Sequence, residues 1–211
     1  VQYLTALGRQ VAVINLDPAN DILPYDGTRV VLPGDGIPGS DYINASMIPG
    51  YGKPREYIAT QAPMRETVAA FWKMVVSNQS TTIVMLGGSV GERDDDACFP
   101  YWPKALNETQ KYGSISVTLS AEKQLPKAKS AIHRVFVVRG GTGAVLTVSH
   151  FQFSGWSPDA TPAKTDAFRQ FRQLVPKGGT APVVVHCDAG VGGTGVFISV
   201  DVETKRFFQR L

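Results

Sequence analysis

The apolar positions of this chain follow two spacings, one typical of helices and one typical of strands. Apolar residues recur at helical spacing over 68–76 and again over 167–174, which predicts two amphipathic helices. A continuous apolar run at 81–86 predicts a buried strand, and the alternation over 115–119 predicts a half-buried one.

Three more segments complete the pattern. Residues 131–138 and 144–153 read as two strands joined through the glycine-rich stretch 139–143. Residues 182–185 form an apolar strand that runs into a second glycine-rich stretch, and a helix is expected from about Thr194 to the C-terminus. Strands interleaved with helices, together with one hairpin, indicate an α/β (α+β) domain with a mixed sheet.

The composition agrees with this fold class and narrows the function. At 211 residues the chain suits one domain, and 43% hydrophobic with 18% charged residues is typical of globular proteins. Lys and Arg are scattered and the net charge is only +3, which argues against a nucleic-acid partner. We find no apolar run of membrane-spanning length and no secretory leader in the sequence, so we expect a cytoplasmic protein with no membrane segment.

The cysteines carry a further restriction. Cys98 and Cys187 are the only two, they lie far apart, and neither belongs to a CxxC or Cys/His spacing. This argues against a disulfide framework and against a zinc site, and it fits a reducing compartment. We expect no metal and no cofactor.

The stretch HCDAGVGGTG at 186–195 carries the chemistry. Its glycines and small residues let successive backbone N–H groups converge, and the helix that follows adds the positive end of its dipole. Such a strand–loop–helix is an anion cradle, and a cysteine at its edge feels the same field, which favours the nucleophilic thiolate. The alternative is a structural cysteine beside a glycine-rich turn. The sequence contains no GxxxxGK[ST] string, so a nucleotide P-loop does not explain the pattern.

This loop resembles the signature of the protein tyrosine phosphatases, usually VHCSAGVGRTG. Other blocks of that family follow in the family order: Gly39–Tyr51 (GSDYINASMIPGY), Tyr57–Pro63, Phe71–Val75, Cys98–Pro103 and His150–Trp156. The resemblance covers roughly Asp21–Leu211 and implies a highly twisted mixed sheet flanked by helices. It also implies that Cys187 is the nucleophile. The substrate-binding residues of the loop would be Asp188, Ala189, Gly190, Val191, Gly192, Gly193 and Thr194.

Two departures from the family lie in the loop itself. Active members carry an arginine where this chain has Gly193, and a guanidinium there would grip two phosphate oxygens and follow the charge into the transition state. The usual serine after the cysteine is Asp188, whose carboxylate would repel a phosphate dianion unless it points to solvent.

Two more departures lie in neighbouring loops. The family's WPD acid loop reads WSPDATP from Trp156, so Pro158 occupies the acid's place and Asp159 is shifted by one residue. Asp159 is either a displaced general acid or an ordinary aspartate in a proline-bounded turn. The tyrosine that stacks on phosphotyrosine in the family is replaced by Ala19.

The resemblance also predicts an incomplete domain, truncated at both ends. The family continues past the helix after the cysteine loop to a glutamine-bearing loop that positions the hydrolytic water, whereas this chain stops at Leu211. Glu92 falls where the family has an acidic loop, but the basic residue expected near Cys98 is Ala97.

Residues 1–20 do not resemble any sequence block of the phosphatase family. The stretch LTALGRQVAVINLDPAN resembles a strand and acidic loop of the GPN-loop GTPases, although the chain has neither a GK[ST] motif upstream of it nor a Gly-Pro-Asn triplet. We therefore divide the chain into an N-terminal segment 1–20 and a phosphatase-like domain 21–211. The segment is either a fragment joined to the domain or a strand of a divergent phosphatase.

Together the departures predict a regulatory or binding pseudophosphatase that is catalytically inactive or severely impaired. The alternative is a low-activity phosphatase that forms a phosphocysteine on Cys187 with Asp159 as the general acid. A third hypothesis, a GTP-binding protein, is disfavoured because the sequence has none of the phosphate-binding motifs of such proteins. The expected partners are a phosphotyrosine protein or peptide, bound weakly, and a protein partner or a second phosphatase domain. We expect the domain to lie in the cytoplasm, either as a cytoplasmic protein or as the intracellular part of a receptor.

Overall fold

The computed structural model describes residues 22–87, 90–91, 98–126, 130–141, 143–156, 165–176 and 179–209. The helices are α3 (Val68–Ser77), α4 (Thr165–Leu174) and α5 (Gly192–Phe208). The strands are β1 (Ala45–Ile48), β2 (Tyr57–Gln61), β3 (Thr82–Leu86), β4 (Thr109–Tyr112), β5 (Ile115–Gln124), β6 (Ala131–Arg139), β7 (Val145–Phe153) and β8 (Val183–Cys187).

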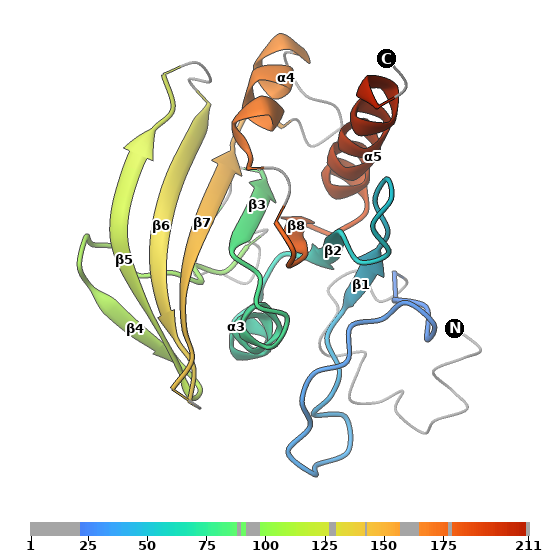
Figure 1. Ribbon diagram of the computed structural model, residues 1–211. Coiled ribbons are helices and arrows are strands. Elements are labelled where there is room, and N and C mark those ends of the chain that lie inside the picture. The colour runs from blue at the N-terminus through green and yellow to red at the C-terminus, as the bar shows by residue number, and fades with distance from the viewer. Residues whose placement is uncertain are drawn as a thin grey trace.

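These strands form one mixed, twisted sheet in the order β1-β2-β8-β3-β7-β6-β5-β4 (Figure 1). The strand β8 pairs in parallel with both β2 and β3, and β3 pairs in parallel with β7. The outer pairs, among them the hairpin β6–β7, are antiparallel. The mixed α/β sheet expected from the sequence is therefore confirmed.

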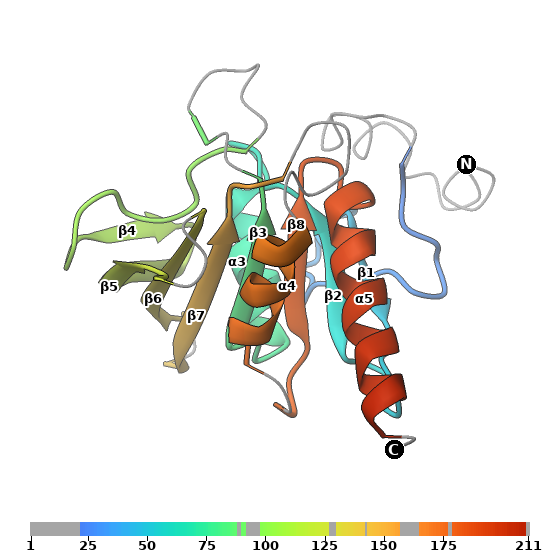
Figure 2. The ribbon, with the colours of Figure 1, turned by 90° about the horizontal axis from the view of Figure 1, so that it is seen from above.

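Helices cover both faces of the sheet. Seen from above, α3 lies behind the central strands while α4 and α5 lie in front (Figure 2). Side chains of β3 alternate between the two layers: Ile83 and Met85 pack in the cluster of α3, and Val84 and Leu86 in the cluster of α4 and α5. A strand buried on both faces reads as a continuous apolar run, which is why 81–86 was recognisable from the sequence.

The elements expected from apolar spacing are present, with small shifts at their ends. The last strand continues through Cys187, and α5 begins at Gly192, ahead of the expected Thr194. The spacing did not predict β1, β2 or β4, since β1 and β4 have four residues each and β4 is mostly exposed at the sheet edge. Among the described residues, no helix is both long enough and apolar enough to cross a membrane.

Candidate active site

The cysteine loop connects β8 to α5 at the carboxyl end of the central parallel strands (Figure 1). Ligands of open α/β sheets bind at this edge, outside the carboxyl ends of the strands. Cys187 is the last residue of β8 and is only 8% exposed. The carbonyl of Asp188 accepts a hydrogen bond from the Ala62 N–H at 2.9 Å, which ties the loop to the end of β2.

The first turn of α5 approaches the cysteine sulfur. Thr194 is fully buried and its hydroxyl donates a hydrogen bond to Cys187 Sγ at 3.2 Å. The first N–H groups of a helix have no partner inside the helix and, with the helix dipole, favour negative charge in front of them. The site therefore provides a hydroxyl donor to the sulfur and backbone donors for an anion.

Gly190 sets the path of the loop. Its φ is +77°, and a Cβ there would stand 2.6 Å from both the carbonyl carbon and the oxygen of Thr60. Any side chain would therefore displace the backbone of β2. The sequence placed this glycine in the cradle, and its contact with β2 explains why no other residue fits.

We expect Gly190→Ala to lower the free energy of unfolding by about 3 kcal/mol. The methyl group would collide with the Thr60 carbonyl, and alanine would also be strained in the left-handed backbone conformation. Gly195→Ala is the matched control, because Gly195 has nothing within 4 Å of its Cβ position and lies five residues further on, in the first turns of α5. Urea denaturation of both variants measures the difference. Equal losses in the two variants would contradict this role of Gly190.

Gly193 lies under the indole of Trp156. A Cβ on Gly193 would stand 3.0 Å from Trp156 Cε2, 3.1 Å from its Nε1 and 3.3 Å from Leu86 Cβ. Trp156 Nε1 is buried and has no hydrogen-bond partner among the described residues. The position where the family carries arginine is thus closely packed, and a side chain there would have to move the indole by a few tenths of an ångström.

Asp188 lies at the edge of the loop and is exposed. Its Oδ1 is 3.6 Å from the place where a Cβ on Gly87 would stand, so the carboxylate is turned toward the end of β3. Partial desolvation raises the pKa of Asp188. Burial, and then the charge of Asp188, raises the pKa of the free thiol of Cys98.

A cavity of about 660 Å³ adjoins the loop. Its volume lies within the usual range of small-molecule sites. The loop contributes Ala189, Gly190, Val191 and Thr194, and the segment 22–25 forms another wall. The remaining lining residues are Thr28, Asn44, Ser46, Ile48, Ala59, Thr60, Gln61, Gly195, Ile198 and Ser199.

Of the loop residues proposed to bind substrate, four therefore line the cavity. Asp188, Gly192 and Gly193 are not among its lining residues. The other residues singled out from the sequence, Ala19, Glu92, Ala97, Pro158 and Asp159, lie outside the described residues, as does the whole of 1–20. Their roles remain predictions.

A family model described as protein-tyrosine phosphatase matches residues 17–209. This chain belongs to the protein-tyrosine phosphatase family. It is 40% identical over 190 residues to the Lar-like tyrosine-protein phosphatase of Caenorhabditis elegans, covering 88% of this chain and 8% of that protein. It is 38% identical over 192 residues to receptor-type tyrosine-protein phosphatase F of Danio rerio, covering 88% and 10%. The chain thus spans about a tenth of the curated relatives it matches.

Solved phosphatase structures share the fold. The catalytic domain of human protein tyrosine phosphatase non-receptor type 18 superposes with a TM-score of 0.85 at 29% identity, covering 98% of this chain and 74% of that one. The same phosphatase in complex with HER2 phosphopeptides superposes with a TM-score of 0.80 at 28% identity, covering 93% and 73%.

Behind the cysteine, the phosphatase domain has a buried polar chain that the sequence did not reveal. The Tyr101 hydroxyl lies 2.7 Å from His186 Nε2 and 2.7 Å from His150 Nε2. Burial lowers the pKa of His186 to about 3, lowers that of His150 and raises that of Tyr101, so all three are neutral at pH 7. One ring nitrogen therefore accepts the hydroxyl proton and the other donates. These hydrogen bonds hold the end of β8 in place at His186, just before Cys187.

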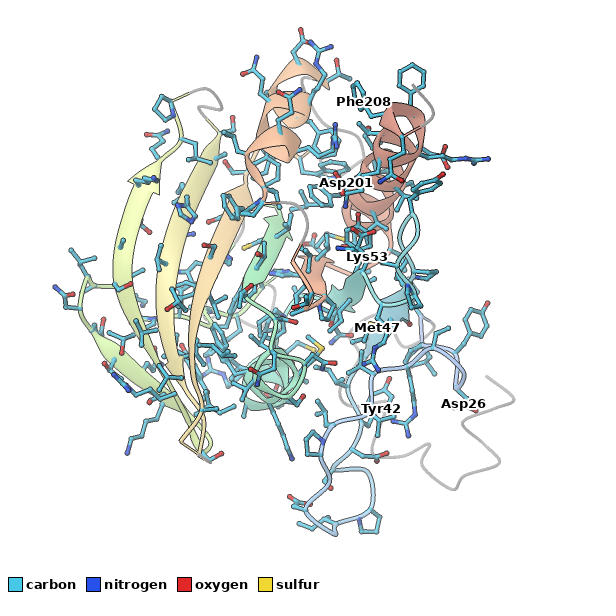
Figure 3. All side chains as sticks on the ribbon, in the orientation of Figure 1. Asp26, Tyr42, Met47, Lys53, Asp201 and Phe208 are labelled. Atoms are coloured by element: carbon cyan, nitrogen blue, oxygen red, sulfur yellow. The ribbon has the colours of Figure 1, made fainter. Side chains whose placement is uncertain are left out.

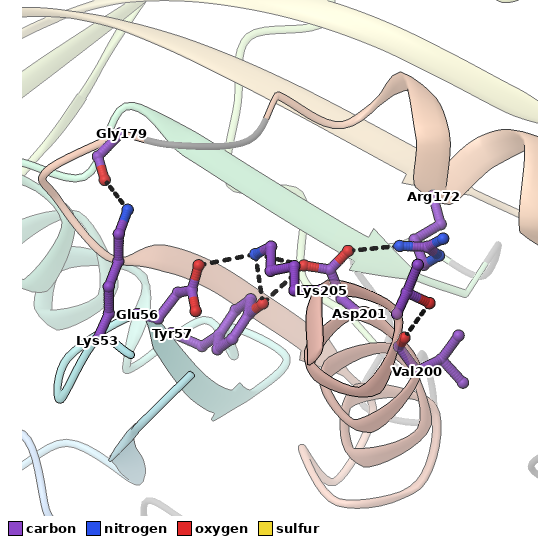
Figure 4. Close-up of polar contacts among 9 residues, drawn as sticks. Lys53, Glu56, Tyr57, Arg172, Gly179, Val200, Asp201 and Lys205 are labelled. Atoms are coloured by element: carbon purple, nitrogen blue, oxygen red, sulfur yellow. Dashed lines mark hydrogen bonds and ion pairs between the residues drawn. The ribbon is translucent and has the colours of Figure 1, made fainter. Parts of the chain in front are cut away.

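A second polar cluster holds α5 in place. On the side of α5 that faces α4 (Figure 3), Asp201 accepts hydrogen bonds from Arg172 at 2.7 Å and from the Tyr57 hydroxyl at 2.6 Å. Lys205 lies 2.7 Å from both Asp201 Oδ2 and Glu56 Oε1 (Figure 4). The cluster joins β2, α4 and α5, and α5 carries Gly193 and Thr194 at its other end.

Proposed function

We propose that this phosphatase domain is a pseudophosphatase, a folded member of the family that binds or regulates and has lost most or all turnover. The observation that carries the proposal is Gly193. It stands six residues after Cys187, at the position of the family's arginine, has no side chain, and lies packed against Trp156 and Leu86.

The physical reason is the charge of the transition state. An arginine fork makes two charge-assisted hydrogen bonds to a phosphoryl group, and removal of one such set of donors costs about 10²- to 10³-fold in rate. Here a dianion would meet the backbone N–H groups and a helix dipole worth roughly half a charge. No described residue that lines the cavity carries a positive charge.

Phosphotyrosine is accordingly a weak ligand in this proposal, with a dissociation constant no tighter than about a millimolar. Phosphatase non-receptor type 18 has been solved with phosphopeptides of HER2. The regulatory role we propose is exerted on a protein partner or on a second phosphatase domain, in the cytoplasm or on the inner side of a receptor. Several similar proteins are receptor-type phosphatases, which supports that setting.

A second candidate is a slow phosphatase. It is favoured by the Thr194 hydroxyl, which donates to Cys187 Sγ and stabilises negative charge on the sulfur. In this candidate the thiolate attacks phosphorus, the aryl oxygen leaves with a proton from Asp159, and water then hydrolyses the phosphocysteine.

The test is hydrolysis of an aryl phosphate by the purified chain and by Cys187→Ser. We expect p-nitrophenol release by the two proteins to be equal, because the guanidinium that stabilises the transition state is missing and the Asp188 carboxylate repels the phosphate dianion. Thermal unfolding of both proteins establishes that they are folded. Turnover by the unmodified chain that disappears in Cys187→Ser would replace the pseudophosphatase with the slow enzyme.

A further inference from the structure

We infer that a second cavity, at the edge of the sheet beside β1, binds an extended segment of a partner protein through one carboxylate side chain of that segment. The inference goes beyond the proposed function and holds whether or not Cys187 turns over. It comes from a cavity of about 530 Å³ whose lining includes two guanidinium groups.

The alternation of side chains along β1 separates this cavity from the one beside the cysteine loop. Ser46 and Ile48 line the first cavity, whereas Met47 lines the second and packs against the core cluster that contains α3. The strand β1 is the outermost strand on its side of the sheet (Figure 1). The other residues of the second lining are Gly27, Thr28, Arg29, Val30, Val31, Pro49, Pro54, Arg55 and Asn78. None of them belongs to the cysteine loop.

The charge of this lining is positive. Arg29 and Arg55 contribute to it, and none of its described residues is acidic. Arg29 is neutralised by Asp41, whose Oδ2 lies 2.8 Å from Nη2. The guanidinium of Arg55 is exposed and has no carboxylate partner in the described part of the chain. One positive charge therefore remains for a ligand, and it matches a single carboxylate. A phosphate dianion would bring one negative charge more than the lining neutralises.

Arg55 is oriented to bind a carboxylate with both oxygens. Its Nη2 donates to Asn78 Oδ1 at 3.3 Å, the one hydrogen bond of this guanidinium among the described residues. Asn78 is held in turn, because its Nδ2 donates to the Met74 carbonyl at 2.9 Å. A guanidinium has five N–H donors in a planar fork, so a pair remains for two carboxylate oxygens.

The negative groups next to this lining in the sequence do not cancel its charge. Asn78 ends α3, whose last carbonyls carry partial negative charge, but its own Nδ2 covers the Met74 carbonyl. Glu56, the neighbour of Arg55, is paired with Lys205 at 2.7 Å. Asp26, the neighbour of Gly27, is exposed, so water and salt screen its charge.

The chain beside the cavity also offers a free backbone edge. The Val30 N–H donates to the Ala45 carbonyl at 2.8 Å, and the Leu32 N–H donates to the Asp41 carbonyl at 2.9 Å. N–H groups alternate in direction along an extended chain, so the Val31 N–H points away from these partners. Within the described residues, neither this N–H nor the Val31 carbonyl has a backbone partner, and Val31 is 58% exposed.

These features select an extended peptide as the ligand. A peptide strand can pair with the backbone of Val31, as in the addition of a strand to a sheet edge, and can place an acidic side chain at Arg55 in the same cavity. Met47, Pro49 and Pro54 supply apolar surface for the neighbouring side chains of the peptide. The net charge of +3 also favours an acidic partner.

The experiment titrates the chain with three short labelled peptides of alternating valine and threonine that differ only in a central glutamate, glutamine or phosphoserine. We expect the glutamate peptide to bind at least tenfold more tightly than the glutamine peptide, because hydrogen bonds between a guanidinium and a carboxylate are charge-assisted. The phosphoserine peptide should bind no more tightly than the glutamate peptide. Fluorescence anisotropy measures the three dissociation constants.

Two variants test the two parts of the site. Arg55→Gln should abolish the preference for glutamate over glutamine. Arg169→Gln is the matched control and should keep it, because Arg169 is an exposed arginine of α4 that does not line the cavity. Val31→Pro removes one N–H and should weaken all three peptides about fivefold while the preference for glutamate is kept. Thermal unfolding of each variant establishes that it is folded.

Equal binding of the glutamate and glutamine peptides overturns the inference, and so does a failure of all three peptides to bind. A glutamate preference that survives in Arg55→Gln would show that the carboxylate binds elsewhere. Tighter binding of the phosphoserine peptide would overturn the choice of a carboxylate, and unchanged affinities in Val31→Pro would overturn the strand pairing. The proposed function is tested separately by hydrolysis of aryl phosphate, so the two can fail independently.

Discussion

Replacing Asp201 by alanine is expected to lower the free energy of unfolding by about 3–5 kcal/mol, because it leaves a buried cation without its carboxylate. Asp201 is 5% exposed, and its partner Arg172 has a side chain that is 6% exposed. Arg172 Nε already lacks a hydrogen-bond partner within the described structure, so the loss of Asp201 would leave a second nitrogen of the same guanidinium, Nη1, without its partner. A domain stabilised by only about 5–15 kcal/mol would lose a large part of its stability.

The pH dependence of this stability loss tests whether the charge of Asp201 is its cause. Burial raises the pKa of Asp201, but the hydrogen bonds from Lys205 and Tyr57 and the nearby cations lower it by more, and the folded pKa lies below the ordinary 3.8. A carboxylate whose pKa falls on folding contributes stability above its unfolded pKa and loses it as the pH falls through the folded one. The difference in unfolding free energy between the unmodified chain and Asp201→Asn should therefore be complete at pH 6 and shrink below pH 3.8.

Urea denaturation at a series of pH values measures this difference. Asp166→Ala is the matched control, because Asp166 pairs with Arg169 on the exposed face of α4, with side chains 78% and 68% exposed. Its loss should stay within about 0.5 kcal/mol at every pH. A pH-independent difference for Asp201→Asn would assign its effect to packing rather than to the ion pair.

The elements that sequence reasoning found are those whose own side chains define them. The helix α3 has a stripe of apolar residues at helical spacing and β3 has a continuous apolar run, so each can be predicted from its own residues without knowledge of its neighbours. The strand β4, with the sequence TQKY, has three exposed residues of four and is defined by its pairing with β5, which no local pattern displays.

The same distinction holds at the site. The cysteine loop is contiguous, and its glycines, its cysteine and its missing arginine could be read directly from 186–195. The partners Tyr57 and Asp201 are 144 residues apart, and Tyr101 and His186 are 85 apart, so both pairings depend on how the strands and helices come together. The contact of Trp156 with Gly193 likewise exists only in the folded chain.

Combining Gly193→Arg with Asp188→Ser is expected to tighten orthovanadate binding by about tenfold to a hundredfold. Each charge-assisted hydrogen bond of a guanidinium contributes about 1.5–3 kcal/mol, and about 1.4 kcal/mol is a factor of ten. Part of this gain is offset, because the new side chain must displace the indole of Trp156, and overpacking costs about 1–3 kcal/mol of stability. The serine removes the negative charge at the edge of the loop.

Quenching of tryptophan fluorescence during a vanadate titration measures the gain, since Trp156 lies against the altered position. Gly193→Lys with the same Asp188→Ser change is the matched control: it adds an equal charge without the planar fork, and it should recover only a small part of the affinity. Equal affinities for the arginine and lysine variants would mean that net charge, rather than bidentate geometry, limits anion binding at this loop. No gain in either variant would show that the loop is not an anion cradle, and the weakness for phosphate would then lie in the loop backbone rather than in the loss of the arginine.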